Sequence, residues 1–327
     1  MKKKKLIWQI PFLLILIVGT IIIIRQQHNT PYQKDTGFIF GTIYHITYQS
    51  DTNYQQEIET ELKKVDQSLS PFNKTSVITQ VNQGKDIEVD EMFTEVFRMA
   101  ESISKETNGA FDITVAPMVN LWGFGFKQGV PPTKAKIDSI KTLVGYEKVA
   151  LEKGRIIKQN PKIMLDCSAI AKGYGSDIVA RFLKKKGISN FMVEIGGEIV
   201  VNGVSEKQVP WHIGINKPTD DSTNTSQEIQ DVLDITDIAM ATSGNYRNFY
   251  YKNGKKYAHT IDPKTGYPVQ HNILSATVLA KMVMGMEGAK QILKKHPDLC
   301  AYLIYADEKG QNKIWYSPSL KNKILNK

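Results

Sequence analysis

Apolar residues recur at helical spacing in four segments of the chain. In Glu57–Leu69 they fall at every third or fourth position, which places them on one face of a helix. Glu91–Thr107 repeats this spacing and is followed by Asn108-Gly109, a pair that commonly ends helices. Two further amphipathic helices are expected at Lys134–Leu143 and Tyr174–Lys186.

Short runs of β-branched and aromatic residues between turn residues indicate strands. The first is expected at Phe38–Tyr48, and the polar, Thr/Ser-rich stretch Asp220–Gln230 is expected to be a surface loop. Because helices and strands do not alternate regularly, the pattern favours an α+β fold over a doubly wound sheet. Further strands are expected at Lys162–Leu165, Phe191–Ile195, Trp211–Ile215, Asp231–Ile235, Ser275–Ala280 and Ala301–Tyr305.

The N-terminus carries a long apolar run. Four lysines precede Leu6–Ile24, which is close to the roughly 20 apolar residues that a helix needs to cross a bilayer. Val18-Gly19-Thr20 is a candidate signal-peptide cleavage site, but Ile21–Ile24 continues the run, so an uncleaved anchor is favoured over a cleaved signal or a buried helix. The lysines should stay in the cytoplasm, with the rest on the extracytoplasmic side of a bacterial inner membrane. We therefore expect a cytoplasmic basic tip at 1–5, a single transmembrane anchor at 6–24, a linker at 25–36 and one domain at 37–327.

Composition and charge narrow the choice of partners. The chain has 327 residues, of which 41% are hydrophobic and 23% are charged, as in a globular protein. Its formal net charge of +9 is compatible with a nucleic acid, an anionic surface or a phosphorylated ligand. Because no nucleic-acid-binding motif is present, we expect no nucleic-acid partner. Cys167 and Cys300 fall in no metal-binding spacing, and the sequence leaves open whether they pair.

Two segments place glycines beside ionisable residues. In Asn108–Pro117, Gly109-Ala110 lets the backbone approach a ligand and Asp112 follows at once; the alternative is a helix stop in which Asp112 caps the next segment. Asp166–Asp177 lies between a predicted strand and a predicted helix, where free N–H groups and Lys172 suit a phosphate. The alternative there is a capped helix with a surface lysine.

Two later segments are also candidates for a site. Glu194–Glu198 contains paired glycines, which suit either a tight turn or a ligand contact. Ala241–Arg247 gathers hydroxyls, an amide and an arginine. His259 stands close to Asp262, which makes it a candidate acid–base group, although a lone histidine is usually structural. The motifs of zinc proteases, serine hydrolases and Rossmann folds are missing from the sequence.

Taken in order, these segments resemble the FAD:protein FMN transferases of the ApbE family. The similarity runs from Phe40-Gly-Thr through Asn-Gly-Ala-Phe-Asp, Asp-x5-Lys-Gly, Gly-Gly-Glu, Thr-Ser-Gly-Asn-Tyr and His-x2-Asp-Pro-x-Thr-Gly. Each motif alone is moderately specific for the family, whereas their ordered combination along nearly the whole of 37–327 is strongly specific. The resemblance implies a single α+β, T-fold-related flavin-binding domain.

The resemblance also implies a reaction. Such enzymes bind FAD and Mg²⁺, move the FMN part onto a Thr or Ser hydroxyl of an acceptor protein, and release AMP. Some members instead hydrolyse FAD. Acceptors are typically extracytoplasmic flavoprotein subunits of membrane redox complexes, which agrees with the expected anchor.

Single residues receive roles from the same resemblance. Phe40 corresponds to the family's Met before Gly-Thr, and Phe72 falls where an aromatic ring stacks on the flavin, without a hydroxyl of its own. His259 is the first candidate for the base that accepts the acceptor's proton, and Asp112 is the second. Ala169 should offer its backbone carbonyl to the metal. The remaining expected contacts of FAD are Ala110, Phe111, Asp112, Asp166, Lys172, Thr242, Ser243 and Ile261.

One segment departs from the family pattern. The family follows its late strand with Ala-Asp-x-x-Ala-Thr, whose Asp and Thr ligate the metal, but here Ser275–Ala280 leads through Lys281 directly into Met282–Gly288. Glu287 is the only carboxylate between Asp262 and Asp298. Because Mg²⁺ prefers oxygen ligands such as carboxylates, we expect weakened metal binding and weakened transfer. A catalytically impaired FAD-binding protein is therefore the alternative, and a purely structural domain is disfavoured.

Overall fold

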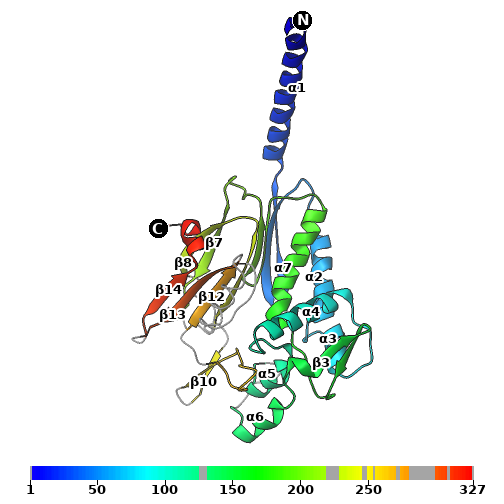
Figure 1. Ribbon diagram of the computed structural model, residues 1–327, viewed down its shortest axis with the longest axis vertical. Helices are drawn as coiled ribbons and strands as arrows, with labels where there is room; N and C mark the ends of the chain where they lie inside the picture. The colour runs from blue at the N-terminus through cyan, green and yellow to red at the C-terminus, as the bar shows by residue number, and fades with distance from the viewer. Residues whose placement is uncertain are drawn as a thin grey trace.

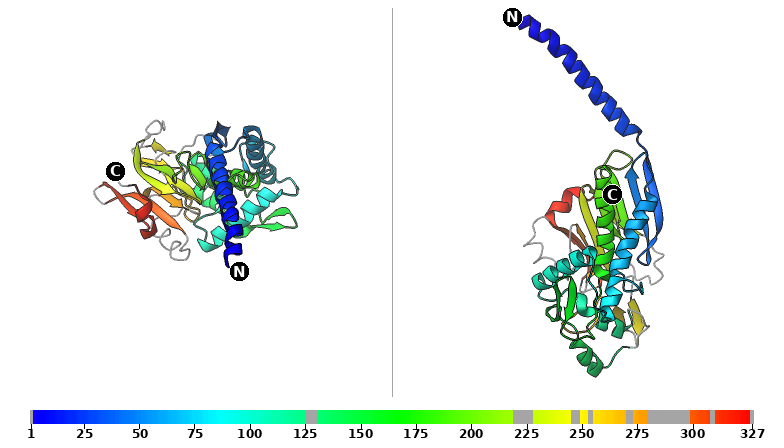
Figure 2. Two further views of the ribbon diagram at one scale, coloured as in Figure 1. Left: turned by 90° about the horizontal axis from the view of Figure 1, so that it is seen from above. Right: turned by 90° about the vertical axis from the view of Figure 1, so that its right-hand side faces the viewer.

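The fold is built on a large antiparallel sheet with helices on one face (Figure 1). The computed structural model describes residues 2–124, 131–218, 228–244, 249–252, 255–269, 273–279, 299–307 and 310–325. The long helix α1 (Lys2–Asn29) extends away from the other elements (Figures 1 and 2).

The large sheet has eight strands in the order β1-β2-β5-β6-β9-β12-β13-β14, and neighbouring strands are antiparallel. This arrangement confirms the predicted α+β class. The eight strands are β1 (Tyr32–Ile39), β2 (Thr42–Gln49), β5 (Phe191–Ile195), β6 (Glu198–Asn202), β9 (Ile238–Gly244), β12 (Ile273–Leu279), β13 (Cys300–Ala306) and β14 (Asn312–Tyr316). Two-stranded sheets pair β3 (Val149–Glu152) with β4 (Arg155–Lys158), β7 (Trp211–Asn216) with β8 (Ile229–Ile235), and β10 (Phe249–Lys252) with β11 (Lys255–Ala258).

The predicted strand Phe38–Tyr48 is in fact a hairpin. Phe40 and Gly41 both have positive φ, 51° and 73°, and join β1 to β2 by a two-residue turn. Such turns match the twist of the flanking strands. The prediction as one strand was wrong because Phe40, an aromatic residue, carries no sequence signal for a left-handed conformation.

The predicted strand Lys162–Leu165 is not part of a sheet. Leu165 instead bonds through its backbone to the side chain of Asn82, whose Oδ1 accepts from Leu165 N at 2.7 Å and whose Nδ2 donates to Leu165 O at 2.8 Å. The amide side chain replaces the hydrogen bonds that a neighbouring strand would have supplied. Apolar alternation alone could not reveal that partner.

The helices follow the predicted amphipathic segments. α7 (Ser168–Lys185) begins earlier than predicted, because Asp166 Oδ1 accepts from Ser168 N at its start. The side chain of Asp90 caps α4 (Glu91–Glu106), and that of Thr133 caps α6 (Lys134–Lys141). The other helices are α2 (Gln55–Leu69), α3 (Val77–Asn82) and α5 (Ala116–Trp122), with 3₁₀ turns η1 (Ile113–Val115), η2 (Tyr146–Lys148) and η3 (Pro318–Lys323).

Apolar cores cover both faces of the large sheet. On one face α2 and α7 lie side by side and bury Ile58, Leu62 and Leu183 against strand residues such as Ile46 and Phe191 (Figure 2). On the other face, the β7–β8 sheet packs against β6, β9 and β13. Both faces of the central strands are therefore covered by other elements.

The N-terminal predictions need correction. α1 continues to Asn29 and β1 begins at Tyr32, so most of the predicted linker 25–36 has regular structure, because β1 pairs with β2 along its whole length. The large apolar side chains from Ile10 to Ile24 are exposed. Within the described part of the chain, no helix combines the length and the apolarity needed to cross a membrane, so the predicted span 6–24 is not supported.

The two cysteines do not form a disulfide. Both are buried and both are free thiols. Cys167 lies in the core beneath α4, and Cys300 lies in the core between the two sheets, where its Sγ is 3.0 Å from Ser319 Oγ. The pairing that the sequence left open is not formed.

Candidate active site

Phe40 lies at the tip of the β1–β2 hairpin and is held against α7. A Cβ added at Gly175 would come within 2.7 Å of Phe40 Cε2, which is too close for any real contact. Phe40 is partly buried and packs against two of the apolar cores. The glycine therefore provides the space that the Phe40 ring occupies.

The turn between β5 and β6 meets the same hairpin. It consists of Gly196 and Gly197, with φ of 56° and 90°. A Cβ added at Gly196 would lie 2.7 Å from Thr42 Cγ2. Positive φ and the lack of space together require glycine at this position. The Gly-Gly motif is thus a turn packed tightly against the hairpin.

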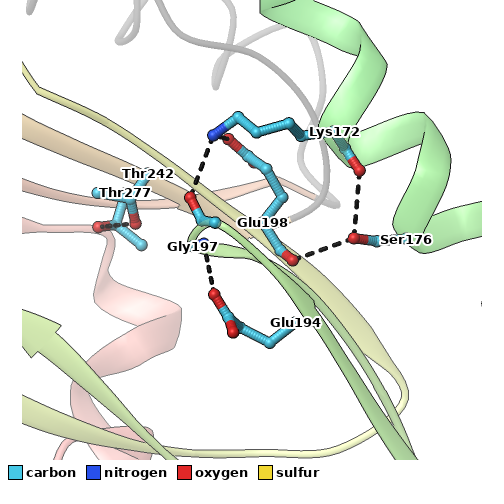
Figure 3. Close-up of polar contacts among 8 residues, drawn as sticks. Lys172, Ser176, Glu194, Gly197, Glu198, Thr242 and Thr277 are labelled. Atoms are coloured by element: carbon cyan, nitrogen blue, oxygen red, sulfur yellow. Dashed lines mark hydrogen bonds and ion pairs between the residues drawn. The ribbon is translucent and has the colours of Figure 1, made fainter. Parts of the chain in front are cut away.

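Lys172 joins α7 to this turn (Figure 3). Its Nζ donates to the Gly196 carbonyl at 3.1 Å and lies 3.5 Å from Glu198 Oε1. Ser176, one turn further along α7, donates from Oγ to the Glu198 carbonyl at 3.1 Å. The ammonium predicted to contact FAD is therefore held between the helix and the turn.

The carboxylates of Glu194 and Glu198 flank the two glycines and make different contacts. Glu194 Oε1 accepts from Gly197 N at 2.6 Å and so stabilises the turn itself. The Glu198 side chain is only 16% exposed, and burial raises its pKa while the Lys172 ammonium opposes that rise. Glu198 is thus the counter-charge of Lys172. Its role was missed from the sequence, where the Gly-Gly-Glu motif drew attention only to the glycines.

Asp166 and Ala169 lie at the start of α7. Asp166 Oδ1 accepts from Ser168 N at 2.8 Å, and Asp166 N donates to Ile113 O at 2.7 Å. This second bond joins two segments that the sequence singled out separately. No side chain caps the helix at Cys167, and Ala169 is exposed in the first turn.

Asp112 is buried and fully engaged by its neighbours. Its Oδ1 accepts from Thr114 N at 2.8 Å and from Thr114 Oγ1 at 2.6 Å, and its Oδ2 accepts from Tyr146 N at 2.8 Å. Burial raises the pKa of Asp112 above its usual range, against the effect of these hydrogen bonds. This geometry is that of a cap holding η1 to η2, and it favours the structural alternative over a role as base.

The flavin-contact turn next to Asp112 has an exposed and a packed side. Ala110 is exposed, whereas Phe111 is partly buried against the core cluster beneath α4. Phe72, in the turn after α2, is 67% exposed. An exposed ring in this position is consistent with the predicted stacking role.

His259 lies at the end of a series of aromatic rings. Trp122 stacks on Tyr257 at 5.5 Å between centroids, Tyr257 on Tyr250 at 5.3 Å, and Tyr250 contacts Phe124 at 5.2 Å. Phe124 in turn meets the His259 ring edge-on at 6.5 Å. The β10–β11 hairpin and α5 thus orient His259 together.

The segment after His259 is a closed turn. Ile261 is buried against Met118 and Trp122 and forms a bridge with Pro268. Asp262 accepts from Lys264 N at 2.8 Å and from Thr265 Oγ1 at 2.9 Å. Its carboxylate therefore stabilises its own turn.

Thr242 and Ser243 point to opposite faces of the sheet, because successive side chains of a strand alternate. Thr242 pairs in register with Thr277, and their hydroxyl oxygens lie 2.9 Å apart (Figure 3). Ser243 is paired with Ala276. The strand geometry thus sets the two expected FAD contacts on opposite faces, and their assignment to FAD stays a prediction.

The side chains that the structure describes do not gather into a cluster of typical metal ligands. Among them, no group of three or more His, Cys, Asp or Glu side chains could hold a metal ion. The segment Met282–Gly288, on which the predicted departure from the family falls, lies outside the described residues. The Ala169 carbonyl alone does not constitute a site.

Comparison with known proteins settles the relationship. The family model described as "ApbE family" matches residues 40–303. The chain belongs to the ApbE family. FAD:protein FMN transferase of Haemophilus influenzae is 36% identical over 90% of this chain and 94% of its own length, and that of Escherichia coli is 33% identical over 92% and 91%.

Solved structures of the ApbE family agree with the fold. The flavin transferase ApbE from Vibrio cholerae superposes with a TM-score of 0.78 at 33% identity, covering 90% of this chain and 99% of that one. The ApbE protein from Thermotoga maritima gives a TM-score of 0.76 at 25% identity, with coverages of 90% and 99%. The predicted family and domain type are therefore confirmed.

Proposed function

We propose that this protein transfers FMN from FAD to a Thr or Ser hydroxyl of an acceptor flavoprotein. The relatives named FAD:protein FMN transferases match along nearly the whole chain, which supports the reaction class. The observation that carries the proposal is the meeting of the β1–β2 hairpin, α7 and the Gly196-Gly197 turn, which places the Phe40 ring against Gly175 and the Lys172 ammonium on the Gly196 carbonyl. A flavin nucleotide has a ring system that suits the Phe40 ring and phosphates that suit the Lys172 ammonium.

The chemistry is a phosphoryl-group substitution. The acceptor hydroxyl oxygen forms a bond to the phosphorus that carries the riboflavin part, and the bond from that phosphorus to the bridging oxygen breaks. AMP leaves with the bridging oxygen, and the hydroxyl proton passes to a base. Lys172 would neutralise charge on the phosphates, and a well-placed cation of this kind favours the transition state.

His259 is the proposed base. The Asp112 carboxylate is occupied by three donors, whereas the His259 ring is partly exposed at the end of its aromatic series. Removal of a general base typically lowers rates by about 10²- to 10⁴-fold. His259→Ala should therefore slow transfer by roughly that factor with little change in FAD affinity. Unchanged transfer by the variant would exclude His259 as the base.

The decisive experiment incubates the full chain with FAD, Mg²⁺ and a Thr-bearing acceptor domain. Covalent flavin fluorescence on the acceptor in a denaturing gel is expected, and replacement of the acceptor Thr by Val should abolish it. Bound FAD without covalent product would instead support the second candidate, an impaired FAD-binding protein. That candidate rests on the single carboxylate, Glu287, between Asp262 and Asp298.

The setting of the reaction is part of the proposal. The predicted acceptor is a flavoprotein subunit of a membrane redox complex, on the extracytoplasmic side of a bacterial inner membrane. Protease added to intact spheroplasts should degrade the protein if it faces outward. Protection from that protease until the cells are lysed would contradict this location.

A further inference from the structure

Glu198 occupies an unusual position for a glutamate. It begins β6 immediately after the Gly-Gly turn, and its side chain is 16% exposed. Burial of a carboxylate is unfavourable unless a cation or hydrogen-bond donors compensate it. Lys172 supplies the cation, at 3.5 Å from Oε1. Ser176 donates to the backbone carbonyl of Glu198 and so holds the residue in place.

Lys172 is in turn constrained from two sides. A lysine side chain is long and flexible, so its ammonium is poorly placed unless contacts restrict it. Here Nζ donates to the Gly196 carbonyl and faces the Glu198 carboxylate. The Gly196 carbonyl takes one of the three N–H donors of the ammonium and the ion pair with Glu198 lies on a second side, which leaves a donor for an anionic oxygen.

We propose that Glu198 is a positioning residue for flavin transfer, which orients the Lys172 ammonium toward the phosphates of FAD. This inference rests on the proposed function. Glu198 acts only through Lys172 and has no contact of its own with the substrate. A purely structural Glu198, which stabilised β6 and nothing more, would not depend on Lys172 in this way.

A double-mutant cycle tests that dependence in the full chain. The four proteins are wild type, Glu198→Gln, Lys172→Met and the double variant. Residues in contact typically show coupling of about 2- to 150-fold. We expect Glu198→Gln to reduce kcat/KM for FAD on the order of tenfold when Lys172 is present and less than about twofold in the Lys172→Met background. Equal effects in the two backgrounds would overturn the proposal.

A conservative variant separates position from charge. Glu198→Asp keeps the charge but shortens the side chain by one methylene, so the carboxylate retreats from Lys172. Loss of activity in Glu198→Asp comparable to that in Glu198→Gln supports an orienting role. Full activity of both variants would contradict it. Thermal unfolding of each variant shows whether the fold survives, and only the folded variants enter the cycle.

Two matched controls use other glutamates. Glu194→Gln removes a carboxylate from the same turn, but Glu194 bonds Gly197 N rather than Lys172, so its coupling to Lys172 should be weaker than that of Glu198. Glu206→Gln breaks the exposed ion pair with Lys34 and should leave transfer unchanged. Coupling of Glu194 to Lys172 as strong as that of Glu198 would contradict a specific role for Glu198.

The cycle also distinguishes this inference from the proposed function. If the wild type binds FAD without transferring FMN, the same four proteins are compared by FAD affinity, measured from quenching of flavin fluorescence. Coupling in affinity then supports the positioning role, although transfer has failed. If the wild type is active but the effects of the Glu198 and Lys172 substitutions are additive, the positioning role alone is overturned. Wild type that neither binds FAD nor transfers FMN overturns both.

Discussion

At the scale of single residues, Asp112 shows that an acidic residue in a family motif can have a structural role. The sequence offered two interpretations, a ligand contact and a cap. Three donors from Thr114 and Tyr146 engage both of its oxygens, so the cap interpretation describes the observed geometry. The acidic group thereby fixes the turn that carries Ala110 and Phe111.

Asp112→Asn should lower the free energy of unfolding by about 1–3 kcal/mol. The amide NH₂ group would replace one carboxylate oxygen, so a backbone N–H that now donates to that oxygen would lose its acceptor. Urea unfolding monitored by tryptophan fluorescence measures this loss. Asp138→Asn on the exposed face of α6 is the control, and it should change stability by less than about 0.5 kcal/mol. Equal stability of the two variants would show that the Asp112 network contributes little.

Gly175→Ala should destabilise the protein, because the new Cβ meets the Phe40 ring at 2.7 Å. Gly173→Ala in the same helix meets nothing within 4 Å and should instead stabilise it by about 0.5–1 kcal/mol. Thermal unfolding compares the two. Phe40→Met should relieve part of the Gly175→Ala defect, since methionine adapts its shape. If Phe40→Met leaves the full defect, the Phe40 contact does not explain it.

At the scale of elements, the sequence predicted those whose signals are local. The helical spacing of Ile58 and Leu62 identified α2, because one apolar face is enough to define an amphipathic helix. The Phe40-Gly41 turn and the Asn82–Leu165 clamp were missed. Both depend on partners distant in sequence or on a backbone conformation that the residue type does not favour.

The tie between α4 and α7 is an element-scale interaction with a pH signature. Arg181 donates two bonds to Glu95, at 2.7 and 3.0 Å, and Tyr174 donates a third at 2.7 Å. Arg181 holds the pKa of Glu95 below its usual value. A lowered carboxylate pKa contributes stability above the unfolded-state pKa, and that contribution disappears as pH falls through the folded-state pKa.

Glu95→Gln should therefore cost about 0.5–1 kcal/mol at pH 7, a modest amount because both partners of the ion pair are partly exposed. The difference from wild type should shrink as the pH falls below about 4. Urea unfolding at several pH values measures it. A difference that stays constant from pH 7 to pH 3 would show that the charge on Glu95 is not its source.

At the scale of the whole molecule, the family could be predicted because its motifs occur in a fixed order along the chain. The contacts among those motifs could not. Lys172 and Gly196 are far apart in sequence, and their hydrogen bond is visible only once α7 lies on the sheet. Likewise, only the pairing of β9 with β12 places Thr242 beside Thr277.

The Mg²⁺ dependence that the family resemblance implies is expected to be altered in this chain. The family resemblance assigns metal ligands to a segment that has no counterpart between Ala280 and Met282, and the described residues assemble no cluster of three ligating side chains. Loss even of an outer-sphere partner typically weakens metal affinity by about 10- to 100-fold. We therefore expect the half-maximal Mg²⁺ concentration for transfer to exceed that of the Vibrio cholerae relative by at least about tenfold. Parallel titrations of both enzymes after treatment with a chelator measure this ratio. Equal half-maximal concentrations would mean that other residues of this chain replace the expected ligands. Glu287→Gln would then be the first variant to test.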